Sequence, residues 1–370
     1  MDLRWTEEQE LLRETIRSLL QKYSSPEIVR ELEDEEPGFR QDLWEELGRQ
    51  GLLGLTIPEE HGGSGMSSLE QVILCEEFGR ALTASPHFAS CVLGARLAPP
   101  ELLPDIATGK RIVTLAWNEL DASSGPDGIH VRAAGYRLTG TKILVPFAAS
   151  ADALLVLARS GDGVGLFLTE REGVEMLHTP DMAAGGSYQV TFDETPATLV
   201  HADGWAALED AMTDGLIALA AQAVGGAERA HEMAVEYAKE RHQFGRPIGS
   251  FQGLAHPLAE MATEIQGAKV LVYEAAWART TKPTVGPLAA MAKMYAADVF
   301  KRTTKVGQQV FGGIGFIRDL DMQLYFRRAK QLEITWLGPR ELEERIARAE
   351  LDTDTPFVGV DYGIGTETGG

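Results

Sequence analysis

The hydrophobic period changes twice along the 370 residues, and this change most constrains the fold. Over residues 3–110 apolar residues recur every three or four positions, as on one face of an α-helix. From 111 to 203 they alternate in short runs separated by Gly, Asp and Pro, which is typical of strands. From 204 onward the helical period returns in longer elements. These zones predict an α+β fold with an N-terminal helical domain at 1–110, a middle antiparallel β domain at 111–203, a C-terminal four-helix bundle at 204–350 and a tail at 351–370.

Shorter patterns place individual elements inside these zones. Thr6-Glu7-Glu8-Gln9 is a capping-box pattern, which predicts the start of a helix. Further helices are expected at 39–55 and 68–81, and an apolar stripe from Leu254 to Ala275 predicts a long helix in the last zone. No helical segment separates the expected strands, which argues against a Rossmann unit. The expected strands are 112–117, 129–133, 136–138, 153–158, 165–169 and 188–192.

The charge balance and the cysteines exclude several classes of protein. The chain has 55 acidic and 34 basic residues, a formal charge of −21 that would repel a nucleic-acid backbone. Cys75 and Cys91 are too few for a disulfide framework or a cysteine-based metal site, so we expect buried thiols and no metal. No run of about 18 apolar residues could span a membrane, and the charged N-terminus does not read as a signal peptide. A cytoplasmic location is the expectation.

Three segments carry residues suited to binding a ligand. The loop at 58–65, Pro-Glu-Glu-His-Gly-Gly-Ser-Gly, has three glycines in four residues, which predicts unusual backbone angles or a close approach of another group. The run 241–252 begins with Arg241, and arginine binds phosphate through forked hydrogen bonds. Arg241 could equally be a surface charge at the C-terminus of a helix. The paired glycines in 309–316 are weak on their own, because most such glycines cap helices.

Taken together, these segments resemble the acyl-CoA dehydrogenase family over residues 5–350. The resemblance rests on the loop at 58–65, on Arg-x-Gln-Phe-Gly-x-Pro-Ile-x-x-Phe-Gln at 241–252, on Gln-x-Phe-Gly-Gly-x-Gly-Phe at 309–316 and on Arg327-x-Ala329-Lys330. It implies a helical–β–helical fold, FAD as cofactor, oxidation of acyl-CoA thioesters to enoyl-CoAs and an electron-transfer flavoprotein as electron acceptor. In the family a glutamate removes the α-proton while the β-hydrogen passes to the flavin as hydride.

The resemblance also implies which residues contact the cofactor. Family tetramers hold each FAD across a subunit interface, and the elements that match 241–252 and 309–316 reach the ADP half of the neighbour's FAD. Shared binding of this kind is therefore expected here. Carried over, the cofactor-binding residues are Arg241, Gln243, Phe244, Ile248, Gln252, Gln309, Phe311, Gly312 and Gly313.

The chain departs from the family at both positions that can carry the catalytic base. Alignment on Arg327-x-Ala329-Lys330 places Trp336 at the usual glutamate, and an indole cannot accept the proton. Leu337-Gly338 follows, so the threonine expected beside the flavin is missing. The alternative base position aligns with Gly215, which has no carboxylate either. No catalytic residue is therefore assigned.

The part of the middle domain that would face the flavin is also altered. The run 117–124, Trp-Asn-Glu-Leu-Asp-Ala-Ser-Ser, replaces the family's Thr-Glu-Pro-Gly-Ala-Gly-Ser-Asp. Leu144-Val145-Pro146 replaces Trp-Ile-Thr, and Pro146 has no N–H to donate to a flavin. The family's Asp-x-x-Arg, which helps to hold the substrate, aligns with Thr213-Asp214-Gly215-Leu216 and is absent. The losses concern groups that hold ring, thioester and base within one subunit, whereas the groups that reach a neighbour's FAD remain.

This distribution of losses favours a subunit of a heteromeric enzyme. The chain resembles the base-deficient subunit of actinobacterial α2β2 dehydrogenases, which act on steroid side chains as CoA thioesters. A paralogous subunit with an intact base would hold the flavin and the acyl-CoA, and this chain would contact the ADP half of that FAD. The steroid is implied by the resemblance alone.

Two alternatives remain open. A standalone enzyme would need a relocated base, for which Asp214 is the best candidate, although a lone Asp is usually exposed to solvent. Glu333 lies three positions from Trp336, and on a helix it would occupy a different place in the site. The other alternative is a non-enzymatic scaffold of the same fold, and retention of phosphate-type residues such as Arg241 argues against it.

Overall fold

The N-terminal part of the chain folds as helices around its own apolar face. The computed structural model describes residues 5–33, 35–36, 38–120, 125–282 and 285–352. The capping box is confirmed, since the Thr6 side chain accepts from Gln9 N and the Gln9 side chain accepts from Thr6 N. A single helix over 39–55 is wrong, because Gly51 has φ +72° and ends α3 before a short 3-10 turn. The main helices are α1 (Glu7–Tyr23), α2 (Pro26–Glu33), α3 (Gln41–Arg49), α4 (Ser68–Arg80), η3 (Phe88–Gly94), α5 (Ala95–Leu97) and α6 (Leu103–Ala107).

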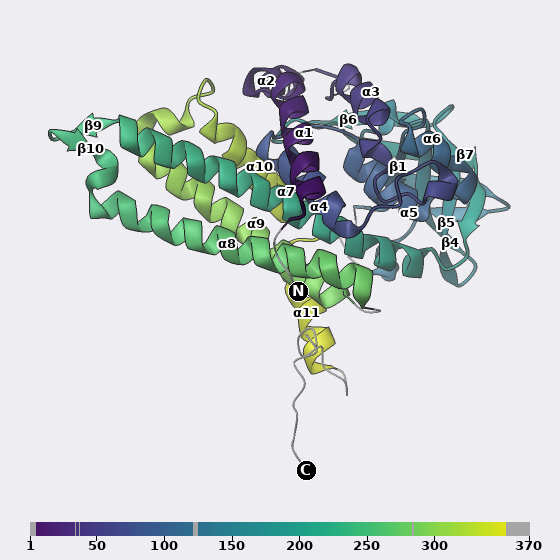
Figure 1. Ribbon diagram of the computed structural model, residues 1–370. Helices are drawn as coiled ribbons and strands as arrows, with labels where there is room; N and C mark the ends of the chain where they lie inside the picture. The colour runs from purple at the N-terminus through teal and green to yellow at the C-terminus, as the bar shows by residue number, and fades with distance from the viewer. Residues whose placement is uncertain (1–4, 34, 37, 121–124, 283–284, 353–370) are drawn as a thin grey trace, which may run out of the picture.

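The middle of the chain forms an eight-stranded sheet, which lies at the right in Figure 1. Its strands have the order β6-β7-β3-β2-β4-β5-β8, and β1 lies beside β4. Neighbouring strands are antiparallel, except that β1 and β2 run parallel to β4. Two strands, β6 and β8, are not foreseen from the sequence because they are short and partly exposed. The strands are β1 (Val113–Ala116), β2 (Arg132–Ala134), β3 (Arg137–Pro146), β4 (Ala153–Ser160), β5 (Gly163–Glu170), β6 (Glu175–Thr179), β7 (Ser187–Pro196) and β8 (Thr198–His201).

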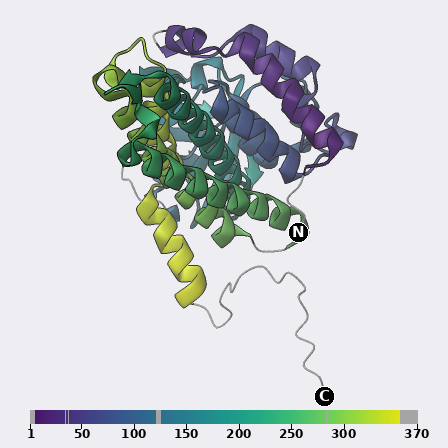
Figure 2. The same cartoon turned by 60° about the vertical axis from the view of Figure 1, so that its left-hand side comes forward.

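Long helices form the C-terminal part. α7 (Gly204–Glu240) leads to a small hairpin of β9 (His242–Gln243) and β10 (Arg246–Pro247), and α8 (Gln252–Thr281) returns beside it (Figure 1). α9 (Gly286–Phe311) packs on both, and α10 (Met322–Ile334) completes the bundle. Figure 2 shows α11 (Pro339–Leu351) pointing away from the body of the molecule. Most of the expected tail, 353–370, lies outside the described residues, and within them no helix is long and apolar enough to cross a membrane.

The N-terminal helices are joined to the bundle where α4 crosses α7. Glycines allow the two backbones to touch there. A Cβ on Gly79 would lie 1.9 Å from the Gln222 carbonyl oxygen, and a Cβ on Gly225 would lie 1.9 Å from the Glu76 carbonyl oxygen. Neither position has room for a side chain, so this crossing requires glycine on both helices.

A buried carboxylate lies at the same crossing. Glu76 accepts a hydrogen bond of 3.0 Å from the Tyr273 hydroxyl on α8, and Lys269 Nζ lies 3.7 Å away. Burial raises the pKa of Glu76 to about 7, and the attraction of the Lys269 ammonium opposes this only in part. The adjacent Cys75, and Cys91 in η3, are buried free thiols as expected, and burial raises the pKa of Cys75 to about 12.

We expect Glu76→Gln to stabilise the protein at and above neutral pH. The pKa is raised from 4.5 to about 7 in the fold, so the folded chain holds a proton that the unfolded chain has released, and stability falls as the pH rises through this range. Glutamine keeps the acceptor for Tyr273 without the charge. Urea unfolding should show a gain of about 1–3 kcal/mol at pH 8 and a smaller gain at pH 5. Exposed Glu260→Gln is the control, and an equal gain at both pH values would contradict the prediction.

Candidate functional site

A cavity of about 500 Å³ lies where the three parts of the chain meet. Its wall comes from the end of α4 and from η3, from loops beside β1, β3 and β7, from α7 and from the end of α10. Trp117, Pro146 and Trp336 all line it. The fold therefore brings together, around one cavity, three of the positions at which the sequence differs from the family pattern.

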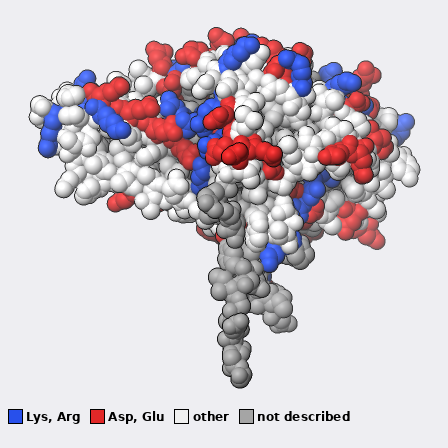
Figure 3. Space-filling view, viewed as in Figure 1, with Lys and Arg blue, Asp and Glu red and all other residues white. Residues whose placement is uncertain are grey.

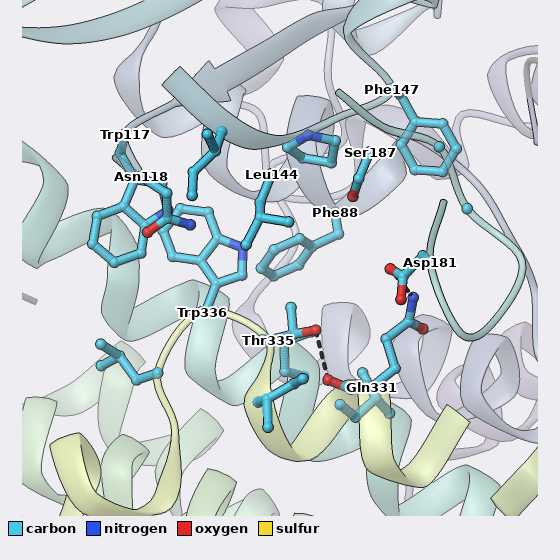
Figure 4. A pocket seen from close by; sticks show the side chains of 18 of the residues that line it. Phe88, Trp117, Asn118, Leu144, Phe147, Asp181, Ser187, Gln331, Thr335 and Trp336 are labelled. Carbon is cyan, nitrogen blue, oxygen red and sulfur yellow. Dashed lines mark hydrogen bonds between the residues drawn. The ribbon is translucent and has the colours of Figure 1, made fainter. Parts of the chain in front are cut away.

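Two indoles close one side of the cavity (Figure 4). Trp117, directly after β1, and Trp336, after α10, stack with ring centroids 5.3 Å apart and an angle of 18° between the rings. Phe88 in η3 packs edge-on against Trp336 at 5.6 Å. Aromatic carbons rest about 3.5–4.0 Å apart, so a third ring between the indoles would need a separation of about 7–8 Å. A flavin ring cannot lie between these two indoles.

The loop that carries Trp336 is held by a buried lysine. Trp336 has φ +71°, a left-handed angle that bulky residues rarely adopt. Lys293 on α9 donates from Nζ to the Glu333 carbonyl oxygen at 2.8 Å and to the Leu337 carbonyl oxygen at 2.6 Å, on either side of Trp336. Burial lowers the pKa of Lys293 to about 8. These two hydrogen bonds fix the indole in the cavity wall.

Gly215, which the sequence analysis aligns with the second base position, lies close to Trp336. Gly215 is buried on α7, and a Cβ there would lie 3.0 Å from Leu93 Cδ2 and 3.6 Å from the ring of Phe88. Phe88 in turn contacts Trp336. The structure thus places Gly215 and Trp336 around one aromatic cluster, and neither of them supplies a carboxylate.

The two carboxylates considered as relocated bases do not line this cavity. The expectation of an exposed Asp214 is wrong, since its side chain is 16% exposed and accepts two hydrogen bonds of 3.0 Å from Arg279. It belongs to a separate hollow that α7 and the end of α8 form with N-terminal segments, among them the start of α4. Glu333 is buried on α10, where hydrogen bonds from Lys301 and Lys330 lower its pKa against the effect of burial. Both carboxylates are engaged with cations outside the cavity.

Three other carboxylates do line the cavity. Glu119 accepts at 2.6 Å from the buried Lys142 ammonium, and Asp181 accepts at 2.6 Å from the Gln331 amide. Glu341, in the first turn of α11, is the third. The sequence did not single out Asp181 or Glu341, because neither belongs to a motif and only the tertiary fold brings their segments here. Residues 121–124 of the altered run lie outside the described residues.

The loop at 58–65 has the close approach that its glycines predict. Gly62 and Gly65 have φ of +78° and +58°. A Cβ on Gly63 would lie 2.1 Å from the Ile57 carbonyl oxygen. The glycines thus serve local folding beside α6, and none of the loop residues lines the cavity.

The motif at 241–252 forms the hairpin that projects from the far end of the bundle (Figure 1). Arg241 ends α7 through its backbone N–H, and its side chain is exposed. Gln243 pairs with Arg246 across a turn in which Phe244 and Gly245 have φ of +54° and +81°. Phe244 is 91% exposed at the tip. Of the remaining predicted contacts, Ile248 is half-buried in the following turn and Gln252 is exposed at the start of α8.

The motif at 309–316 lies at the same end of the bundle. Tyr237 on α7 stacks on Phe311 at the end of α9 with ring centroids 4.4 Å apart, so the two helix ends adjoin. Phe311 is buried, whereas Gln309, Gly312 and Gly313 are exposed. None of the nine predicted cofactor contacts lines the cavity. The structure therefore gathers both motifs on one surface, which is remote from the cavity of the same chain.

Comparison with known proteins identifies the family. The family model for the acyl-CoA dehydrogenase N-terminal domain matches residues 6–98, and that for the C-terminal domain matches 202–351. FadE27, an acyl-CoA dehydrogenase of Mycobacterium tuberculosis, is 31% identical, and the match covers 95% of this chain and all of that protein. The chain belongs to the acyl-CoA dehydrogenase family. The acyl-CoA dehydrogenase IpdE2 of the same organism is 32% identical over 92% of this chain and 96% of its own.

Solved structures of this family superpose closely on the chain. The ChsE4–ChsE5 complex from Mycobacterium tuberculosis contains a chain with a TM-score of 0.86 and 31% identity, covering 96% of this chain and 100% of that one. A chain of the Tcur3481–Tcur3483 steroid acyl-CoA dehydrogenase variant has a TM-score of 0.85 and 32% identity, covering 92% and 97%. The acyl-CoA dehydrogenase fold expected from the sequence is confirmed.

Acyl-CoA dehydrogenases depend on FAD, and the two stacked indoles of this chain leave no slot for a flavin ring between them. The stacked indoles fill the space beside the base position, and Pro146 offers no N–H. The backbone of Leu144 and of Phe147 turns at φ of +53° and +52° on either side of it. No reaction step is therefore assigned to a flavin in this cavity.

Proposed function

We propose that this acyl-CoA dehydrogenase homologue is the base-deficient subunit of a heteromeric, FAD-dependent enzyme. A paralogous subunit with an intact glutamate would hold the flavin ring, the acyl-CoA and the base. This chain would contact the ADP half of that subunit's FAD through its nine motif residues. When bound, FAD supplies the acceptor for the substrate hydride, and this chain moves no proton.

The separation of the two surfaces carries the proposal. In the cavity, Trp117 stacks on Trp336, the residue that the sequence alignment places at the family's glutamate. At the far end of the bundle, Arg241, Gln243 and Gln309 keep exposed hydrogen-bonding groups on a protruding surface. Arginine and backbone N–H groups beside glycines are suited to phosphate oxygens. A surface of this kind serves a cofactor that is held by another chain.

The surface around the motifs suits contact with another subunit. In Figure 3 the side of the bundle along α8 is largely uncharged, basic residues lie at the hairpin end, and acidic and basic residues crowd the middle of the molecule. Ile314 and Phe316, in the turn that follows α9, are exposed at the end of the bundle that carries the hairpin. Depletion of charge with exposed aromatic side chains is typical of the core of a subunit interface.

The substrate and the electron acceptor are inferred from relatives. One structural neighbour is a steroid acyl-CoA dehydrogenase and another is a two-component ChsE4–ChsE5 complex, so a steroid side chain as CoA thioester is the substrate that we propose. An electron-transfer flavoprotein is the proposed acceptor. Another neighbour comes from a structure of the electron-transferring flavoprotein of Acidaminococcus fermentans.

Flavin content tests the proposal directly. The native complex is purified through a tag on this chain, and flavin and polypeptides are quantified. We expect two kinds of chain, about one FAD per two chains, and a colourless, inactive protein when this chain is expressed alone. A yellow, active homo-oligomer with one FAD per chain would refute the heteromeric function.

Substitution of the motif residues tests their role. We expect Arg241→Ala combined with Gln243→Ala to lower the FAD content of the complex at least ten-fold, because two phosphate-type contacts are worth roughly 1.5–3 kcal/mol or more together. The ratio of the two polypeptides should stay unchanged. The control is Arg340→Ala, an exposed arginine of α11, which should leave the flavin content unaltered. A doubly substituted complex with full FAD content would mean that the hairpin only serves assembly.

A further inference from the structure

The loop that joins α9 to α10 carries the paired glycines of the second motif. It comprises residues 312–321 and begins with the short 3-10 turn η8 (Gly312–Phe316). Gly312 has φ +65°, and a Cβ on Gly312 or on Gly313 would have no described atom within 4 Å. Two glycines in open space leave a loop free to change its shape unless another part of the chain holds it.

One arginine of the N-terminal helices holds the end of this loop. Arg30, in the last turn of α2, lies 288 positions before Arg318 in the chain. It donates from Nε to the Arg318 carbonyl oxygen at 3.0 Å and from Nη2 to the Asp319 carbonyl oxygen at 2.9 Å. The same Nη2 forms an ion pair with the Asp321 carboxylate. A planar guanidinium has donors enough to bind three acceptors at once, so the side chain fixes the backbone as well as the charge.

Asp321 gives up a local role for this contact. It precedes α10 as the N-cap residue, and an aspartate there normally accepts from the first N–H groups of the helix. Among the described residues its side chain makes no cap hydrogen bond, and its backbone has helical angles, φ −67° and ψ −28°. The carboxylate accepts from Arg30 instead. The fold therefore uses this side chain to tie the loop to α2.

α2 is itself anchored, so it can serve as a fixed support. Val29, next to Arg30, is buried in the core. Glu33, at the end of α2, accepts at 2.6 Å from Nη2 of Arg327, which lies inside α10. Two arginine–carboxylate pairs thus join α2 to the α10 region, and of these two pairs only the one with Arg30 lies on the loop.

We propose that Arg30 is a positioning residue for the shared FAD site. It holds the loop 312–321 in the shape in which Gly312 and Gly313 meet the ADP half of the partner subunit's FAD. The inference rests on the function proposed above. Without this tether the loop would have to be ordered when the cofactor binds, and ordering a loop on binding lowers affinity. A helix that carries none of the nine predicted contacts thereby acts on the shared site.

The dissociation constant of FAD from the complex tests this role. The complex is purified through a tag on this chain and diluted in steps, and the released FAD is measured in an ultrafiltrate. We expect Arg30→Ala to raise the dissociation constant about three- to ten-fold, because the loop loses its preorganisation. Arg30→Lys keeps the charge without the fork and should raise it about two- to three-fold. The kcat measured with FAD in excess should stay unchanged, since this chain takes no part in the chemical step.

Glu33→Ala is the matched control, because it breaks the other pair between α2 and α10 and leaves Arg30 in place. Both alanine variants should lower the midpoint of urea unfolding, but Glu33→Ala should raise the FAD dissociation constant by less than about two-fold. An equal rise in both variants, or no rise in Arg30→Ala, would overturn the positioning role. If Arg30→Ala does not assemble, Asp321→Asn removes the charge of the pair and should raise the constant about two-fold. An unchanged constant in Asp321→Asn would then overturn it.

The double variant Arg241→Ala with Gln243→Ala separates this inference from the proposed function. If the double variant lowers the FAD content and Arg30→Ala leaves the dissociation constant unchanged, the role of Arg30 alone is refuted. If neither variant affects FAD, the shared site is refuted, and the positioning role falls with it.

Discussion

Replacing Gly225 by alanine is expected to destabilise the protein by about 3 kcal/mol or more, at the upper end of overpacking effects. The new methyl group would lie 1.9 Å from the Glu76 carbonyl oxygen, which belongs to the backbone of α4 and cannot turn away. The two helices must separate, and contacts along their whole crossing weaken. Urea unfolding followed by circular dichroism measures the loss.

A second glycine-to-alanine change serves as the control for this prediction. Gly267 lies in the middle of α8, and a Cβ there would meet its nearest neighbour, the Tyr295 hydroxyl, at an ordinary 3.6 Å. Gly267→Ala should therefore gain up to about 1 kcal/mol from helix propensity. If both substitutions stabilised the protein, α4 and α7 would not be in backbone contact.

Loss of the Lys142 ammonium should be comparably severe. Lys142 is fully buried on β3, where its Nζ donates to the Trp117 carbonyl oxygen at 3.0 Å and to Glu119 at 2.6 Å. Lys142→Met leaves the Glu119 carboxylate buried without its cation, which typically costs about 3–5 kcal/mol. It also releases the backbone of Trp117. We expect a lower midpoint of urea unfolding together with an altered near-UV circular dichroism signal of the indole stack.

A double-mutant cycle separates the two effects. The double variant Lys142→Met with Glu119→Gln removes both charges, so most of the lost stability should return. The side-chain oxygen of glutamine can still accept from the N–H groups of His130 and Val131, which donate to the Glu119 carboxylate in the wild type. Exposed Lys110→Met is the control for loss of a lysine. Additive losses in the double variant would show that the pair is not coupled.

The sequence predicts those parts of the fold that depend on local hydrophobic periodicity and on capping residues. The capping box at Thr6 and the helix after Ser67 depend on neighbours in sequence, and both are found where they are expected. The break at Gly51 was not foreseen, because the apolar spacing continues across it and only the backbone angle reveals the end of α3. β6 escaped prediction because an exposed edge strand has little hydrophobic alternation to display.

In the candidate site, too, local motifs were predictable and contacts between distant segments were not. Alignment of motifs located Trp336 and Gly215, and the structure places them around the ring of Phe88. The stacking of Trp336 on Trp117 could not be predicted, since their contact depends on how α10 meets the sheet. Asp214 was misjudged because its partner Arg279 lies 65 residues away on another helix. Pairing across long loops leaves no pattern in a sequence.

The hairpin tip has a consequence for how such a protein is made. Phe244 is 91% exposed, and Ile314 and Phe316 are also exposed, so an unassembled copy presents an apolar surface that favours aggregation. Copies synthesised in excess should therefore be recognised by chaperones and degraded rather than accumulate. Synthesis of this chain and its partner subunit in equal amounts, for example from adjacent coding sequences, would avoid the degradation of unassembled copies.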